Sequence, residues 1–597
     1  MKRRLAISGL AIALVAGCMS QDNPKYDAAE KVYEQVQADR GKANELAFDY
    51  SNGKKVKPLG LKAGILAMES VAKRLEQAEI EELAKDHKWL GWKIHDIYRD
   101  LVTMYAYDND EAGAVAVMNR LLKKCRESDG ERGQVLKEGG VFSRMIWRSD
   151  APVMAMISKN GAFAARYREY LQMAGFGLAL DNGALSSPYK SNLSNEEKIA
   201  GLAQFWSMAK YNFVYLDKID FDWNTVMTEY TPRVLKTRST YEYYRVLQSL
   251  CARLKDGHTN VYLPSQDFQT HQGGRPPIRT ALIEGQVVVT NVFSPEVPVL
   301  EPGDIITHIG GVPTIQYAEK AWGPYACSST PQDREARLFS YDLLRGPEKS
   351  AVTLTIHRAD GSTREVKVPR SGYKTTKGES TYAFNIRPDG VAYVRFSTCE
   401  DPSLVTKLKS DLESHKDIKG LVIDLRMNGG GSSSIGAQVV TGLARQGFTV
   451  PATTYQTRLY SPTKLAWGNR QGLSPVSDDT DVLEPPKVKW FDGPCALLIG
   501  PRTFSAAEDW TGYWRAANVG PVVGMPTGGS TGQPLSFNLP GGGSARVCTK
   551  QDLLPDGTKF VGVGIQPDIQ VPWTVADVRA GRDPQLERAV HEVLKSR

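Results

Sequence analysis

The stretch Leu421–Gly436, LVIDLRMNGGGSSSIG, carries the strongest indication of the fold. It begins as a continuous apolar run, which is typical of a strand buried on both faces of a parallel sheet, and a helical pattern follows its glycines. The same alternation continues through the runs VAYVRFS, CALLIG and VGPVVGM. Because strand–helix alternation is typical of α/β layered domains, we assign residues 373–597 to an α/β core.

The preceding sequence divides into three further regions. Residues 266–372 contain short alternating strands, such as GQVVVTNVF, with glycine-containing hairpin turns, which predicts a small β domain. Residues 190–265 and 18–185 place apolar side chains at three- and four-residue intervals. This spacing predicts a helical subdomain and, before it, an N-terminal all-helical accessory domain. A chain of 597 residues is too long for a single core.

The N-terminus predicts an export signal. Three basic residues precede the apolar run Leu5–Val15, and small residues then lead to Cys18. The run is too short to cross a bilayer core of about 30 Å as a helix. The small residues and the cysteine resemble a bacterial lipobox, so we expect residues 1–17 to be removed and Cys18 to carry lipid. The protein would then be anchored to a membrane of the bacterial cell envelope, on the periplasmic face or the cell surface. Plain secretion is the alternative.

Composition excludes several classes of function. The chain has 41% hydrophobic and 24% charged residues, which is ordinary for a globular protein. A net charge of +7 is small for 597 residues, and the sequence has no basic run with interleaved aromatics, so we expect no nucleic-acid partner. Six cysteines remain beside Cys18, without a CxxC pair or a Cys/His cluster of metal-ligand spacing. We expect no metal and no cofactor. The sequence does not decide between disulfides and free thiols for the six cysteines.

Two strand–helix junctions could carry chemistry, because active sites of α/β domains gather where strands end. At the first, Asn428 is followed by Gly429, Gly430 and Gly431, whose N–H groups could face an anion or an oxyanion. The stretch lacks the lysine of a phosphate-binding loop and the full GxGxxG spacing. A plain tight turn is the alternative.

At the second junction, CALLIGPRTFSAAEDW, Ser505 opens a helix. Ser505 and Glu508 form the S-x-x-E pattern of a capping box, and most such serines are caps. A serine at a helix N-terminus can also act as a nucleophile, with the N–H of Ala506 helping to hold an oxyanion. Such a nucleophile needs a base. Of eight histidines, His258 stands at a helix end in LKDGHT, between two predicted domains.

The strings LKDGHT, EPGDIITHIGG, LVIDLRMNGGG, TFSAAED and VGVGIQPDI occur in the order seen in the tricorn and carboxyl-terminal-processing serine peptidases. The resemblance covers about Leu193–Leu594. It implies a crotonase-like α/β catalytic core with an inserted PDZ-like β domain, which would bind extended peptides by adding a strand to its sheet. It also implies Ser505 as nucleophile and an oxyanion hole from Gly430, or its neighbour Gly429, with Ala506. Polypeptides would be the substrates.

The resemblance also bears on the base. Processing proteases of this family use a lysine where Gly529 stands here, followed by a glutamine that Gln533 matches. The tricorn-like branch uses a histidine that His258 matches. That branch has a serine before the histidine, where this chain has Gly257. It also has an acidic residue in the stretch before the GIxPD element, where the stretch KFVGVG of this chain has none. For the group that orients the histidine, the candidates are Asp256 and Gln533.

Together these features predict a serine endopeptidase that works through an acyl-enzyme, with Ser505 as nucleophile and His258 as base. One alternative is a carboxyl-terminal processing protease. Another is a catalytically inactive peptide-binding lipoprotein in which Ser505 is only a helix cap. Acyl-CoA chemistry of the crotonase type is disfavoured by the export signal.

Overall fold

The computed structural model describes residues 24–49, 55–76, 88–127, 151–159, 161–173, 187–294, 299–372, 380–449, 454–455, 476–477, 482–486, 488–554 and 556–596. They divide into two compact units, residues 1–183 and residues 184–597. The predicted signal segment and Cys18 lie outside the described residues. None of the helices in the described ranges is both long enough and apolar enough to cross a membrane.

The first unit consists mainly of helices packed around one apolar core. Met68, Leu101 and Leu121 come from three different helices and are almost fully buried there. The predicted helical region is confirmed, and the structure adds a short antiparallel strand pair. The elements are α2 (Pro24–Ala47), β1 (Phe48–Asp49), β2 (Lys55–Val56), α3 (Pro58–Leu75), α5 (Lys88–Tyr107), α6 (Glu111–Glu127), α8 (Ala151–Ser158) and α9 (Ala162–Met173).

The second unit begins with a helical layer. The hydroxyl of Ser194 accepts a hydrogen bond from the amide of Glu197 (3.3 Å), whose carboxylate accepts one from the Ser194 amide (2.8 Å), so a capping box starts the first helix. The layer ends at a short strand that leads away from the DGHT string. Its elements are α10 (Asn195–Asn212), η4 (Leu216–Lys218), η5 (Trp223–Thr225), α11 (Val226–Leu235), α12 (Thr240–Ala252) and β3 (Asn260–Tyr262).

A six-stranded antiparallel sheet follows, at the positions where alternating strands were predicted. The left-handed backbone of Gly310, Gly311 and Gly361 (φ +57°, +79° and +81°) forms the expected turns between strands. Helices between Thr314 and Asp342 were not anticipated. The elements are α13 (Ser265–His271), β4 (Ile278–Ile283), β5 (Gln286–Val292), β6 (Ile305–Ile309), β7 (Val312–Pro313), α14 (Thr314–Ala321), η6 (Gly323–Tyr325), α15 (Pro331–Glu335), the π-helix η7 (Ala336–Asp342), β8 (Ala351–His357) and β9 (Thr363–Pro369).

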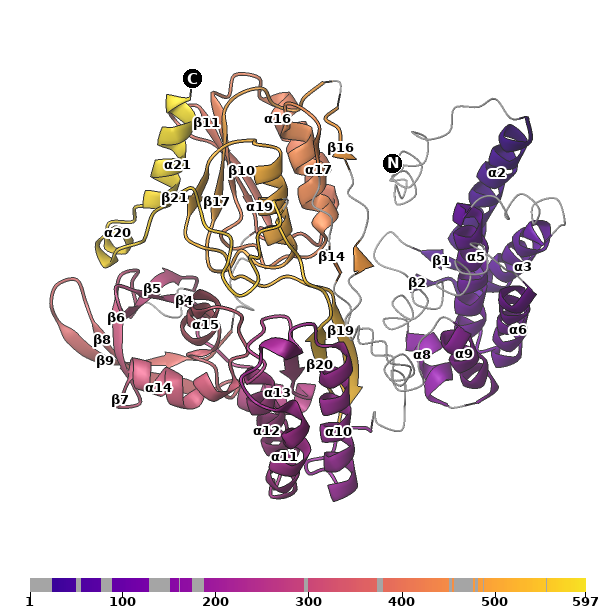
Figure 1. Cartoon of the computed structure of the whole chain (residues 1–597), viewed down its shortest axis with the longest axis horizontal. Coiled ribbons are helices and arrows are strands. Elements are labelled where there is room, and N and C mark those ends of the chain that lie inside the picture. Colours follow the sequence, from indigo (N-terminus) through magenta and orange to yellow (C-terminus); the bar gives the residue numbers. More distant parts are fainter. Residues whose placement is uncertain are drawn as a thin grey trace, which may run out of the picture. The chain divides into compact units, whose positions relative to one another are not determined.

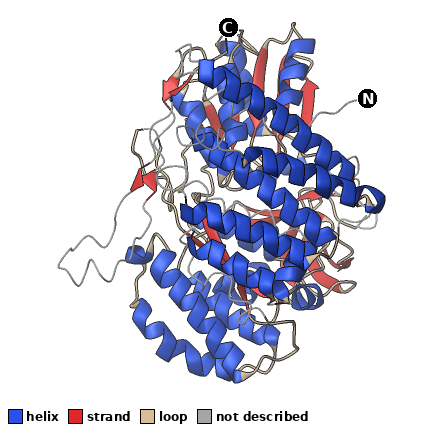
Figure 2. Cartoon of the chain, turned by 90° about the vertical axis from the view of Figure 1, so that its right-hand side faces the viewer, coloured by secondary structure: helices blue, strands red, loops and turns tan. Residues whose placement is uncertain are grey.

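The α/β core is built on a second six-stranded sheet in the order β10-β11-β12-β17-β18-β21, parallel except for β10. Helices α16, α17 and α19 cover one face and α21 the other (Figure 1). Figure 2 shows these strands, in red, with helices around them near the C-terminus. The elements are β10 (Tyr382–Ile386), β11 (Val391–Phe396), α16 (Ser403–Ser414), β12 (Gly420–Asp424), α17 (Ser433–Leu443), β17 (Cys495–Ile499), α19 (Ala506–Ala516), β18 (Val522–Gly524), β21 (Ile569–Gln570), α20 (Val575–Arg579) and α21 (Pro584–Lys595).

Smaller sheets complete the unit. The strand that follows the DGHT string joins a three-stranded sheet in the order β19-β20-β3, although the pairing strands are more than 280 residues apart in sequence, as the pair Arg546 and Asn260 shows. This pairing brings the DGHT string to the α/β core. The remaining strands are β13 (Phe448–Thr449), β14 (Thr454–Tyr455), β15 (Val476–Ser477), β16 (Val482–Leu483), β19 (Pro534–Leu539) and β20 (Gly543–Cys548).

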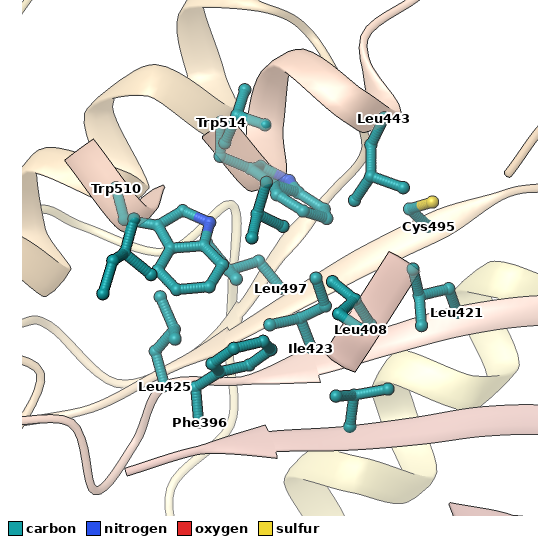
Figure 3. Close-up of a cluster of buried hydrophobic side chains, with 14 of the residues drawn as sticks. Phe396, Leu408, Leu421, Ile423, Leu425, Leu443, Cys495, Leu497, Trp510 and Trp514 are labelled. Carbon is teal, nitrogen blue, oxygen red and sulfur yellow. The ribbon is translucent and has the colours of Figure 1, made fainter. Parts of the chain in front are cut away.

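The apolar contacts on the covered face of the sheet fix the helix that begins after Ser505. Trp510 of α19 packs edge-on against Phe396 of β11, with ring centroids 5.1 Å apart, among strand side chains such as Ile423 (Figure 3). Gly436 of α17 allows close approach, because a Cβ there would lie 2.5 Å from the Trp510 Cβ. The N-terminus of α19 is therefore held by packing on two sides.

Candidate active site

Ser505 and His258 are brought together although 247 residues separate them in sequence. Ser505 lies between β17 and α19, and its Oγ is 2.9 Å from Nε2 of His258, which lies between α12 and β3. The imidazole ring stacks on the ring of Phe504 with centroids 4.9 Å apart and an interplanar angle of 6°. The histidine is 4% exposed, so its orientation is fixed by packing as well as by hydrogen bonds.

The backbone of Ser505 is strained. Its φ of +57° and ψ of −128° are rare for a residue with a side chain and cost about 1–3 kcal/mol. Hydrogen bonds from the Ser505 amide to the Ser530 carbonyl (3.1 Å) and from the Phe504 amide to the Asn428 carbonyl (3.0 Å) hold the turn. An ordinary helix cap has an extended, unstrained backbone. A sharp, strained strand-to-helix turn is how some hydrolases expose a nucleophilic serine to its histidine. Ser505 has both the strained backbone and the contact with His258.

The second ring nitrogen of His258 has a partner that the sequence did not indicate. Nδ1 lies 2.8 Å from Oγ of Ser530, a buried residue in the loop between β18 and β19. When Nε2 accepts the proton of Ser505, Nδ1 carries a hydrogen and donates it to Ser530. Gly257 leaves room for this hydroxyl, because a Cβ at that position would lie 3.0 Å from Ser530 Oγ.

Neither candidate for the orienting group occupies this place. The carboxylate of Asp256 is buried and accepts a hydrogen bond from Thr259 Oγ1 (2.6 Å). Burial raises the pKa of Asp256 to about 6. Gln533 contributes its main-chain carbonyl, which accepts a hydrogen bond from Thr549 Oγ1 (2.5 Å). Among the described residues, Ser530 is therefore the group that contacts Nδ1.

The carboxylate of Glu508 organises the loop around Ser530. Its Oε2 accepts from the amides of Ser530 (2.9 Å) and Ser505 (3.3 Å), and its Oε1 from the amide of Gly529 (2.8 Å) and the hydroxyl of Thr527 (2.5 Å). Burial raises the pKa of Glu508 to about 8, and these hydrogen bonds oppose that shift. One buried side chain thus positions both serines that contact His258.

The glycine loop lies directly against the serine. Gly430 has a φ of +103°, and a Cβ there would lie 2.6 Å from the Cβ of Ser505. Its amide, however, donates to Oδ1 of Asn428 (2.9 Å). In the described part of the chain, the amides of Gly429 and Ala506 have no hydrogen-bond acceptor. The structure thus places Gly429 and Gly430 on the loop before α17 and Ala506 at the first residue of α19, next to Ser505, with the amides of Gly429 and Ala506 uncommitted within the described residues.

The surroundings keep His258 neutral. Burial lowers its pKa to about 3, and the guanidinium groups of Arg546 and Arg337 add to the effect. Arg337 donates to the carbonyl of Gly257 (3.1 Å) and to the carboxylate of Asp333 (2.9 Å), which holds the loop before the histidine. An uncharged imidazole can accept a proton at neutral pH.

Asp424, the acidic residue at the end of β12, makes contacts that hold the fold together. Its carboxylate accepts hydrogen bonds from Arg426 (2.7 Å) and from the hydroxyl of Tyr393 (2.8 Å). Arg426 also pairs with Asp583 just before α21 (2.7 Å). Asp424 therefore ties a strand end to the helix on the opposite face of the sheet. The described residues include six buried cysteines, and five of them are free thiols: Cys251, Cys327, Cys399, Cys495 and Cys548.

Two protein-family models match parts of this chain. The model of peptidase family S41 matches residues 390–571, and the model of the tricorn protease C1 domain matches residues 196–252. The first range contains Ser505 and Ser530. The second covers α10–α12 and ends shortly before His258.

Curated relatives come from both branches of the family. A chloroplastic C-terminal processing peptidase of Tetradesmus obliquus is 24% identical over 351 residues, which cover 55% of this chain and 68% of that protein. Tricorn protease homolog 1 of Streptomyces coelicolor is 30% identical over 186 residues, which cover 30% of this chain but 15% of that protein.

Among solved structures, mature CPAF has a similar fold, with a TM-score of 0.53 at 15% identity over 67% of this chain and 98% of that one. This likeness concerns the fold alone. The mixed α/β content with an N-terminal helical region is confirmed. With an S41 match over residues 390–571 and a tricorn C1 match over residues 196–252, this chain contains domains of the serine peptidases to which the C-terminal processing and tricorn proteases are similar.

Proposed function

We propose that the chain is a serine endopeptidase that hydrolyses polypeptides through an acyl-enzyme, with Ser505 as nucleophile and His258 as general base. The observation that carries this proposal is the 2.9 Å contact between Ser505 Oγ and His258 Nε2. A serine is activated when a base lies within hydrogen-bond reach and a further group orients that base. The strained φ of +57° at Ser505 gives additional support, because a helix cap needs no such strain.

In the proposed reaction, Ser505 Oγ attacks the scissile carbonyl carbon while Nε2 takes the hydroxyl proton. Nε2 then gives this proton to the leaving amine as the C–N bond breaks, which leaves an ester on Ser505. A water molecule attacks the ester, its proton passes to Nε2, and Ser505 regains a proton as the acid product leaves. The amides of Gly429 and Ala506 are the proposed oxyanion donors, since the amide of Gly430 is committed to Asn428.

The assay uses unfolded casein and the full-length protein. The proposal expects fragments from wild type and none above background from Ser505→Ala. A synthetic peptide with both ends blocked separates an endopeptidase from a carboxyl-terminal processing protease, because only an endopeptidase cleaves it readily. If the wild-type protein cuts neither substrate while remaining folded, the peptide-binding alternative is favoured.

Ser530 is proposed as the residue that orients His258. Ser530→Ala should lower kcat about 10- to 30-fold with KM changed less than twofold, because loss of one hydrogen bond leaves Nδ1–H buried without a partner at a cost of about 1–3 kcal/mol. Kinetics on the blocked peptide measure both constants, and Ser414→Ala, an exposed serine on α16, is the matched control. An unchanged kcat would remove Ser530 from the mechanism.

Two finer features of the fold belong to the same proposal. We propose that residues 373–597 form a crotonase-like core and that residues 266–372 form an inserted PDZ-like domain, which binds extended substrate by strand addition. The parallel sheet and the antiparallel sheet with its flanking helices support these assignments. A variant that cannot bind substrate at the PDZ-like domain should have a higher KM for long polypeptides and an unchanged KM for short peptides.

We also propose that Cys18 is lipidated and that the mature protein is anchored in the bacterial cell envelope. The apolar run and small residues before Cys18 support this. Cys18→Ser should move the protein from the membrane fraction to the soluble fraction after cell lysis, measured by immunoblot. Retention in the membrane fraction would contradict lipid anchoring through this thiol.

A further inference from the structure

A cavity of about 870 Å³ lies away from the catalytic serine, between the helices α11 and α12 on one side and β7, α14 and η6 on the other. Both sides belong to the second compact unit. The volume lies within the range of about 300–1,000 Å³ that is typical of ligand sites. Three tyrosines contribute to its walls: Tyr241, Tyr317 and Tyr325.

The cavity lining is strongly cationic. Arg233, Lys236, Arg245 and Lys320 line it, against a single carboxylate, Glu242. Oε2 of Glu242 is already used, because it accepts a hydrogen bond from the amide of Arg238 (2.7 Å). Arg233 pairs with Glu229 (2.8 Å). Within the described residues, the other three cations form no ion pair.

Arg245 is the most informative of these cations. It donates to the side-chain oxygen of Gln248 (2.8 Å) and to the carbonyl of Ala321 (3.1 Å), and its guanidinium carbon lies 3.2 Å from the ring centroid of Tyr325. All three partners are neutral. Burial lowers the pKa of Arg245, so its charge is partly removed from water; the carboxylate of Asp342 opposes this shift but forms no ion pair with Arg245. A planar guanidinium in this setting favours a carboxylate, which it can bind through two parallel hydrogen bonds.

We propose that this cavity is an exosite, a binding site separate from the catalytic residues, for an acidic segment of a polypeptide. Asp or Glu side chains of the segment would pair with Arg245, Lys236 and Lys320, and its apolar atoms would pack on the tyrosine walls. The proposal rests on the peptidase function in one respect: the bound polypeptide is taken to be a substrate. Polypeptides with acidic segments would then be preferred.

The test measures binding by fluorescence anisotropy with full-length Ser505→Ala protein, which cannot consume the probe. The probe is a fluorescein-labelled hexapeptide of alternating Glu and Leu with an amidated C-terminus. Its first comparison peptide replaces Glu by Gln. A second has Gln and Leu with a free C-terminus, which distinguishes side-chain carboxylates from a terminal one.

The Glu peptide should bind at least about tenfold more tightly than either Gln peptide at 50 mM salt, and less tightly as salt rises, because exposed ion pairs are screened. Adding Arg245→Met should weaken binding about tenfold, and Lys320→Gln or Lys236→Gln about threefold each. Lys416→Ala, an exposed lysine on the segment after α16, is the matched control and should change nothing.

Four results would overturn the exosite. The first three are equal affinity for the Glu and Gln peptides, equal effects of Lys416→Ala and Lys320→Gln, and displacement of the Glu peptide by inorganic phosphate at the low concentrations expected of a general anion site. Tight binding of the free C-terminal Gln peptide would also do so. The two proposals fail separately, because binding is measured without catalysis. Casein cleavage without selective binding removes the exosite alone, and selective binding without cleavage removes the peptidase function alone.

Discussion

Ser505→Ala is expected to lower kcat on a polypeptide substrate by about 10⁵-fold or more, the scale reached when the nucleophile of a serine peptidase is removed. Only Oγ is lost, and the strained turn stays held by the amides of Phe504 and Ser505. Binding of substrate should therefore persist. The measurement is single-turnover cleavage of the blocked peptide, together with affinity for the uncut peptide.

The matched control is Ser414→Ala, which removes a hydroxyl bonded only to a helix carbonyl in the described residues. It should retain wild-type kcat and KM. A Ser505→Ala protein that keeps more than about 1% of wild-type kcat would show that another group is the nucleophile.

His258→Ala is expected to lower kcat about 10⁴-fold, because Ser505 loses the group that accepts its proton. The substitution also leaves a cavity beside the ring of Phe504, so added imidazole should restore part of the activity. His415→Ala, which removes an exposed imidazole after α16, is the matched control and should leave kcat unchanged. If His258→Ala and His415→Ala behave alike, His258 is not the base.

The catalytic activity is expected to depend on pH less than that of an enzyme whose histidine base has an ordinary pKa. The base works when neutral, and the lowered pKa of about 3 keeps His258 neutral as pH falls through 6.5, where a histidine in water would become protonated. Activity should therefore persist at pH 5. The contribution of His258 to folding stability falls as pH drops from 6.5 towards 3, because over that range the unfolded chain binds a proton at His258 while the folded one does not. Steady-state kinetics at pH 5 and pH 7.5 on folded protein measure this, and a tenfold loss at pH 5 would contradict it.

Much of the core could be predicted from sequence, because its strands are continuous apolar runs. VAYVRFS, GLVIDLR, CALLIG and VGPVVGM became β11, β12, β17 and β18, since a parallel sheet covered on both faces leaves no strand face in water. The helices in residues 314–342 were missed. They lie among short β-strands, and elements of three to eight residues carry too little periodicity to distinguish a helix from a loop.

The site was only partly predictable, for a geometric reason. Ser505 and His258 stand in recognisable strings, whereas Ser530 contacts His258 across 272 residues of sequence from a glycine-rich loop. The sequence offered one signal, the glycine at position 257. Because Gly257 has no side chain, it leaves space beside His258 for the hydroxyl of Ser530. The hydrogen bond from the Gly430 amide to Asn428 could not be predicted from sequence either, because it depends on the conformation of the loop.

Labelling with a serine-directed fluorophosphonate probe, followed by peptide mapping by mass spectrometry, tests directly whether Ser505 is the activated nucleophile. We expect one modified residue, Ser505, in wild-type protein and in the Ser414→Ala and His415→Ala controls. Labelling should be lost in Ser505→Ala and strongly slowed in His258→Ala, because the probe reports an activated hydroxyl. Modification at another serine, or equal labelling rates of wild type and His258→Ala, would contradict the Ser505–His258 mechanism.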